Sequence, residues 1–138
     1  NMKYTLEIDE QQARVLAQAC DTLSRVYCGQ IGIAVEPLLH WRQGQGHKVD
    51  RQALDAGVAI VHQELTGLSR DTNFGIHSRE IPDAARVAFD LLQVIRHALW
   101  LAQGEGRIRN CVDADVSRTS MEQPLAAIKA SPGGLGTS

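Results

Sequence analysis

The sequence predicts a mainly helical α+β domain, with three long helices, one short helix and a small β ribbon in which N- and C-terminal strands pair. Three long stretches carry apolar residues at helical spacing, and residues 3–8 alternate as a half-buried strand does. Residues 107–112 form a second candidate strand. The 138 residues are the length of one domain. We expect a folded body over residues 2–112 and a partly flexible or partner-docked tail over 113–138.

Composition excludes several classes of protein. Lys and Arg number 14 against 16 Asp and Glu, so the chain is not a generally basic binder of nucleic acid polymers. No apolar run approaches the roughly 20 residues of a membrane span, and the start does not resemble a signal peptide. The three cysteines form no C-x-x-C pair, so we expect free thiols in a cytoplasmic protein without a membrane contact.

The first strand and the first helix have clear sequence signals. Alternation places three apolar side chains on one face of the strand: Tyr4, Leu6 and Ile8. Asp9 and Gln12 form a capping-box pattern that begins a helix over residues 10–28. Its apolar face is expected to be Leu16, Cys20, Leu23 and Tyr27, with Val15, Ala19 and Val26 beside them.

Glycine and proline divide the middle of the chain. We expect Gly29 and Gly32 to end or kink the first helix, and Pro37 to open a short second helix. Asp50 can cap the next long helix, which ends at Gly67. An irregular loop of about a dozen residues follows, and loops of that length are often functional.

The last long helix begins at Pro82 and Asp83 and ends at Gly104. Its few polar positions fall in one line: Arg86, Asp90, Gln93, His97 and Trp100. The rest is almost continuously apolar, so the helix must be covered on several sides. Because a domain of this size has few other helices, we expect a homo-oligomer, either a dimer or a higher assembly of dimers.

The loop before that helix holds four candidate ligand contacts. Phe74 could stack on a base, and Asn73 could pair with the edge of adenine. His77 and Arg79 could bind phosphate. The alternative for Phe74 is that it packs into the core and holds the loop in place.

Four further candidates for anion binding lie nearer the C terminus: Arg96, His97, Arg107 and Arg109. Within the helix, Arg96 could instead stack along Trp100, and His97 could bond to Gln93. The two strand arginines could instead belong to a solvated strand face.

No catalytic motif occurs in the sequence. His62-Gln-Glu64 matches the first half of a nucleotide deaminase motif, but no P-C-x-x-C follows, so we expect His62 on a solvated helix face. Cys28 lies at a helix C terminus, which raises a thiol pKa and disfavours a nucleophile. We therefore predict no catalytic residue, no metal and no cofactor, and a protein that is not an enzyme.

Four segments resemble a known family. They are Lys3-Tyr-Thr-Leu-Glu-Ile-Asp-Glu-Gln-Gln-Ala13, Leu23-Ser-Arg-Val-Tyr-Cys-Gly-Gln30, Asn73-Phe-Gly-Ile-His-Ser-Arg-Glu-Ile-Pro-Asp83 and Asp90-Leu-Leu-Gln-Val-Ile-Arg-His97. Together they look like the first-described Thoeris anti-defence proteins of phages, which sequester cyclic ADP-ribose-type signals without cleaving them and assemble from dimers. The region 37–70 and the Gly-rich tail lie outside the similar segments.

The resemblance implies a phage protein that acts in the cytosol of the infected bacterium. It implies ligand contacts at Arg25, Asn73, Phe74, Arg107 and Arg109, near subunit interfaces. The predicted function is therefore binding and sequestration of a small anionic cyclic nucleotide or cyclic ADP-ribose-type immune signal. The alternatives are a small nucleotide hydrolase with a site shared between subunits, or a non-catalytic structural or protein-interaction module.

Overall fold

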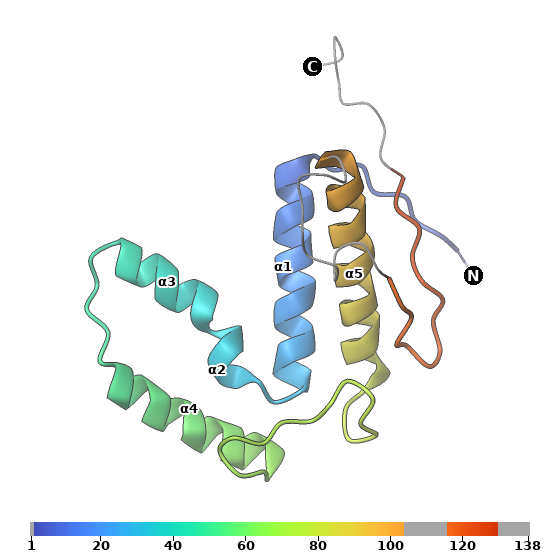
Figure 1. The fold of residues 1–138 in the computed structure, drawn as a ribbon. Coiled ribbons are helices and arrows are strands. Elements are labelled where there is room, and N and C mark those ends of the chain that lie inside the picture. The colour runs from blue at the N-terminus through green and yellow to red at the C-terminus, as the bar shows by residue number, and fades with distance from the viewer. Residues whose placement is uncertain (1, 104–115, 130–138) are drawn as a thin grey trace.

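The computed structural model describes residues 2–103 and 116–129 (Figure 1). In this part of the chain the regular elements are all helices: α1 (Glu10–Tyr27), α2 (Ile31–Ala34), α3 (Glu36–Gly44), α4 (Arg51–Thr66) and α5 (Asp83–Gln103). Figure 1 shows α1 and α5 packed side by side, with α2 and α3 forming an arm that leads away from the lower end of α1, and α4 lying below that arm. Among the described helices, α4 packs against α2 and not against α1, α3 or α5.

The α+β prediction is wrong for the described residues, which contain no strand. Residues 2–9 form an irregular, exposed segment, in which Tyr4 is 88% exposed and Leu6 is 70% exposed. A strand needs a second strand to satisfy its backbone, and none lies beside this segment in the described part of the chain. The expected partner, residues 107–112, lies outside the described residues.

The three long helices lie where the sequence places them. Asp9 accepts a hydrogen bond from the Gln12 amide at 2.8 Å, and the Gln12 side chain accepts one from the Asp9 amide, which completes the capping box. The short helix is correctly placed at Pro37 but is preceded by α2. Gly32 does not break a helix; it lies inside α2, where an added Cβ would be 3.6 Å from Cγ1 of Val58.

Small side chains of α1 face α5. The stripe that is buried or half-buried there is Ala13, Ala17, Cys20, Ser24 and Cys28. Leu92 and Ile95 of α5 form the upper core with Ala17, and Ala85 forms the lower core with Cys28 and Ile81. Because the α1 side chains are small, the two helices approach closely, and the larger apolar residues of α1 lie on other faces.

The polar line of α5 binds a segment that the sequence assigns to the tail. We call residues 116–121 the C-terminal strap. The side chain of Gln93 donates to the carbonyl of Ser117 at 2.8 Å and accepts from its amide at 3.1 Å. The carboxylate of Asp90, which is 4% exposed, accepts from the amide of Ser120 at 2.9 Å. The line is polar because it supplies the hydrogen bonds that an extended backbone needs.

The first turn of α5 holds both the strap and the preceding loop. Asp83 accepts from the Ser120 hydroxyl at 2.6 Å and from the Met121 amide at 2.9 Å. Arg86, 4% exposed, donates to Asp83 at 2.8 Å and to the carbonyl of Ile76 at 3.1 Å. These contacts hold the pKa of Asp83 far below its ordinary value, through the Ser120 hydroxyl first, then Arg86 and the Met121 amide.

The strap changes the argument for an oligomer. We expected α5 to keep an uncovered apolar face, but α1 covers one side of it and the strap covers another. Val94 and Ile95 are buried as a result. An oligomer stays a prediction, and its interface must lie elsewhere than on the middle of α5.

Candidate ligand-binding site

One candidate site is a cavity of about 400 Å³ between the α2–α3 arm and α4. That volume is within the range of small-molecule sites. The loop after α4 closes one end of the cavity, and Figure 1 shows α3 and α4 diverging toward the other end. Its apolar surface comes mainly from Ile31, Val35, Leu39, Leu54 and Val58.

Two glycines bring the elements of the cavity together. Gly29 has φ 82° and ends α1, where the Gln30 amide donates to the carbonyl of Arg25 at 2.8 Å. An added Cβ on Gly29 would lie 2.9 Å from Cγ2 of Thr66, so the turn that follows α1 lies close to the last turn of α4. Gly67, with φ 70°, ends α4 and turns the chain into the loop.

The buried side chain of His62, in α4, holds that loop in place. It is 4% exposed, and its Nε2 lies 2.7 Å from the carbonyl oxygen of Thr72. Because a carbonyl only accepts, Nε2 carries the proton of this hydrogen bond. The Nδ1 atom lies 3.2 Å from the Thr66 hydroxyl. The expectation of a solvated His62 is therefore wrong, because the side chain ties α4 to the loop.

The polar groups lie at the two ends of the cavity. At one end Arg51 pairs with Asp55 at 3.4 Å, and Glu36 lies on the same lining. At the other end Arg70 and Asp71 follow α4. The 15 residue steps of α4 separate these ends by about 22 Å, so the two arginines cannot bind one phosphate together.

Asn73 is the predicted contact that lines the cavity. With its amide nitrogen turned toward the backbone, it donates to the carbonyls of Thr72 and Gly29, each at 3.2 Å. Its side-chain oxygen is then the atom left for a ligand. Asn73 can accept a hydrogen bond from an amino group, but it cannot make the two-bond contact with adenine that the sequence suggests.

Arg25 and Phe74 have structural roles near the cavity. Arg25 pairs with Asp21 at 3.0 Å and donates to Gln30 at 2.7 Å, and Gln30 lines the cavity. Phe74 packs on the lower core of Cys28, Ile81 and Ala85, as the core alternative for this residue predicts.

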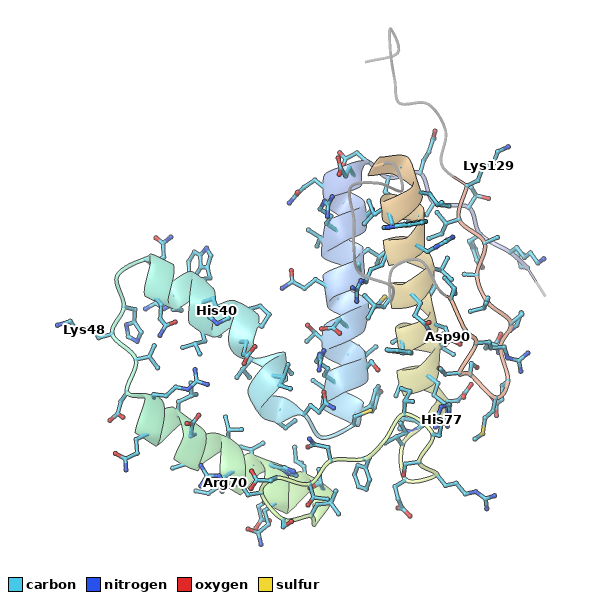
Figure 2. All side chains as sticks on the ribbon, viewed as in Figure 1. His40, Lys48, Arg70, His77, Asp90 and Lys129 are labelled. Atoms are coloured by element: carbon cyan, nitrogen blue, oxygen red, sulfur yellow. The ribbon has the colours of Figure 1, made fainter. Side chains whose placement is uncertain are left out.

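Four further predicted contacts within the described residues do not line the cavity. His77 and Arg79 are exposed on the turn before α5, and Figure 2 shows His77 near the lower end of that helix. His97 stacks on Trp100, with ring centroids 5.8 Å apart, and Arg96 lies beside it in α5. Arg107 and Arg109 lie outside the described residues.

Sequence reasoning missed the residues that do line the cavity. Arg70 and Asp71 stand in the same loop as Asn73, which is the one signal that could have identified them. Arg51 and Glu36 come from two consecutive helices, α4 and α3, and the sequence does not show that these helices line one cavity.

A second hollow, of about 280 Å³, lies between the upper half of α5 and residues 116–128. Val94, Ala98 and Leu101 line it from α5, and Leu125 and Ile128 line it from the C-terminal side. It is mainly apolar, with His97 at its edge.

The thiols of α1 are poorly suited to nucleophilic chemistry. Burial raises the pKa of Cys28, against an opposing effect of Arg25 and Arg86, and burial also raises the pKa of Cys20. Both thiols are therefore protonated at neutral pH.

Residues 2–103 and 116–129 contain neither a candidate metal site nor a helix that could cross a membrane. No three side chains of His, Cys, Asp or Glu gather there in a way that could hold a metal ion. None of the helices in those residues has the length and apolar character needed to cross a membrane.

In comparisons with known proteins, the chain matches no family model, no curated protein and no solved structure.

Proposed function

We propose that the protein binds and sequesters a small nucleotide signal of the cyclic nucleotide or cyclic ADP-ribose type without cleaving it. The observation that carries the proposal is the cavity between the α2–α3 arm and α4, which has an apolar middle and polar ends. An apolar wall suits a base, and Arg70 suits one anionic group at the loop end. The resemblance to phage Thoeris anti-defence proteins supports the signal class and a place in the cytosol of an infected bacterium.

The charges of the lining limit the ligand. Three carboxylates and two arginines line the cavity, and the charges of Arg51 and Asp55 neutralise each other. A ligand with many clustered phosphates would therefore meet too little positive charge. A ring system with one anionic end, accepted at Arg70, fits the lining better.

Binding without turnover agrees with the state of His62. Both of its ring nitrogens are within hydrogen-bond distance of Thr66 and Thr72, so neither points a proton at a ligand. The alternative hydrolase would use His77, Arg79 and His97. About 14 helical residues separate the turn before α5 from His97, which is about 21 Å, so one chain does not bring them together.

A thermal-shift screen with cyclic mononucleotides, cyclic dinucleotides and cyclic ADP-ribose isomers tests the proposal. A ligand at a hundredfold excess over Kd stabilises the fold by about 2.7 kcal/mol. Heat denaturation of the complex should then release the ligand chemically unchanged, as mass spectrometry can establish. Recovery of a cleaved product would favour the hydrolase, and a flat response to the whole panel would favour the interaction module.

Two arginine variants locate the site. Arg70→Ala should weaken binding about tenfold to a hundredfold, because a charge-assisted hydrogen bond contributes about 1.5–3 kcal/mol. Arg79→Ala is the matched control, since Arg79 is exposed on a turn that does not line the cavity. Equal loss in both variants, measured by calorimetric titration, would place the ligand elsewhere.

A further inference from the structure

The free end of the α2–α3 arm carries an exposed aromatic ring close to two exposed cationic side chains. Trp41, in the second half of α3, is 60% exposed. Arg42 and Lys48 are exposed as well, and Figure 2 shows Lys48 extending outward from the turn between α3 and α4. We call residues 40–48 the arm tip. None of these residues lines the cavity of the proposed function, so the tip is a separate surface.

The arm tip is the positively charged end of an acidic molecule. Residues 37–49 contain Arg42 and Lys48 but no Asp or Glu, whereas the rest of the chain has 12 Lys and Arg against 16 Asp and Glu. Neither Arg42 nor Lys48 forms a salt bridge within the part of the chain that the structure describes. The next carboxylate along the chain, that of Asp50, caps α4 by accepting from the amide of Ala53 at 3.1 Å. The two positive charges of the tip are therefore available to an anionic partner.

The turn at the tip has a defined shape that brings the ring and the cations together. Gly46 has a left-handed φ of 85°, and the amide of His47 donates to the carbonyl of Arg42 at 3.1 Å. This is the longer hydrogen bond of a Schellman motif, which ends a helix in a fixed turn. It joins the residue before Lys48 to the residue after Trp41. The ring and both cations therefore share one end of the arm without any rearrangement of the backbone.

We propose that the arm tip binds single-stranded nucleic acid, with one base stacked on Trp41 and phosphates bound by Arg42 and Lys48. An exposed ring stacks any unpaired base, because every base has a π-face, and cations beside the ring follow the backbone of the strand. No other ring of the described residues stacks on Trp41. Because the rest of the chain is acidic, the contact is confined to the tip and covers a few nucleotides without sequence preference.

The composition of the tip favours a nucleic acid over an anionic membrane surface. A helix that lies in a membrane interface needs a broad apolar face opposite its cations. On the nine residues of α3, the exposed large apolar side chains are Leu38 and Trp41. Residues 43–46, which follow them, are glutamines and glycines. Such a surface offers hydrogen bonds and one stacking ring, but too little apolar area to enter a bilayer.

This surface does not depend on the proposed function, and fluorescence anisotropy of a labelled single-stranded oligothymidylate tests it. With the full chain at about 20 mM salt, the Kd should be about 100 μM or lower. Trp41→Ala should weaken binding about fivefold or more, because the stacked base is lost. Tyr4→Ala is the matched control, since Tyr4 is an exposed aromatic residue of the N-terminal segment, and it should leave the Kd unchanged.

The salt dependence of the Kd tests the two cations. On a single strand, each neutralised phosphate contributes a slope of about −0.7 to the logarithm of the association constant against the logarithm of salt concentration. The unmodified protein should therefore have a slope of about −1.4, and Arg42→Ala or Lys48→Ala a slope of about −0.7. Arg79→Ala and Arg70→Ala are controls outside the tip, and both should retain the full slope.

Trp41→Phe keeps an aromatic ring and should retain most of the binding. Circular dichroism of each variant should retain the helical signal, because the substituted side chains are exposed. Absence of binding at a protein concentration of about 500 μM would overturn the proposal. Equal losses in Trp41→Ala and Tyr4→Ala would also overturn it. So would sedimentation with phosphatidylglycerol vesicles by a protein that does not bind the oligonucleotide, since the tip would then be a membrane contact.

Discussion

Gly29 is a single residue on which the close approach of the turn after α1 to the end of α4 depends. It has a left-handed φ of 82°, and a Cβ there would lie 2.9 Å from Cγ2 of Thr66. Gly29→Ala should lower the free energy of unfolding by about 2–3 kcal/mol, since it adds backbone strain to a steric clash. Gly46→Ala is the matched control, because Gly46 has φ 85° with open space around it. It should cost about 1–2 kcal/mol, and urea unfolding that shows equal losses would contradict the close contact.

Substitution of Phe74 shows whether its ring belongs to the core or contacts a ligand. Because its ring packs on Cys28, Ile81 and Ala85, Phe74→Ala should lower the free energy of unfolding by about 3 kcal/mol. Phe74→Leu should recover most of the loss. If thermal unfolding shows normal stability for Phe74→Ala while nucleotide binding disappears, the ring stacks on a base instead.

At the scale of elements, α5 and the strap form one unit whose stability depends on pH. Asp83 has a pKa lowered from its ordinary 3.8 by the Ser120 hydroxyl, Arg86 and the Met121 amide. Its contribution to stability is therefore complete above about pH 5 and is lost as the pH falls below about 4, where the unfolded chain takes up the proton first. The urea midpoint should fall over this range. Asp83→Asn should have a lower midpoint at pH 7 and a flatter pH profile; an unchanged profile would contradict the role of Asp83.

The helices could be predicted from the sequence because their signals are local. The capping box at Asp9, the cap at Asp50 and the stop at Gly67 each act within a few residues. The strand at residues 3–8 failed because alternation cannot show whether a partner strand lies beside it. The contact between the strap and α5 could not be predicted for a similar reason. Asp90 and Ser120 are 30 positions apart, and a polar line on α5 does not reveal which segment it binds.

The candidate site was less predictable than the fold. Asn73 was identified because it stands in an unusual loop, but His62 was misjudged because a histidine on a polar stretch looks solvated. The faces of α1 were also interchanged: Leu16 and Leu23 were expected in the core, where Ala17 and Ser24 lie instead. Periodicity identifies an apolar face, but it does not show whether the helix packs on that face or on a neighbouring stripe of small residues.

At the scale of the whole molecule, the chain has two parts that differ in how many buried contacts hold them in place. α1 and α5 share the core clusters and the strap binds α5, whereas α4 contacts α2 and the loop held by His62. The proposed ligand cavity lies in the less supported part, between helices that diverge in Figure 1. Ligand-binding regions are often drawn from the less stable parts of a fold, because they must adjust when a ligand enters.

Hydrogen exchange measured by mass spectrometry should reveal this difference. Without ligand, peptides from α3 and α4 should exchange faster than peptides from α1 and α5, because fewer buried contacts oppose local opening. A nucleotide that stabilises the protein in the thermal-shift screen should slow hydrogen exchange in α2, α4 and the loop around Arg70. It should leave the exchange rate in the middle of α5 unchanged. The Arg70→Ala variant, at the same nucleotide concentration, should lose most of that protection. Protection confined to α5 or the strap would place the ligand at the second hollow instead and would contradict a site between the arm and α4.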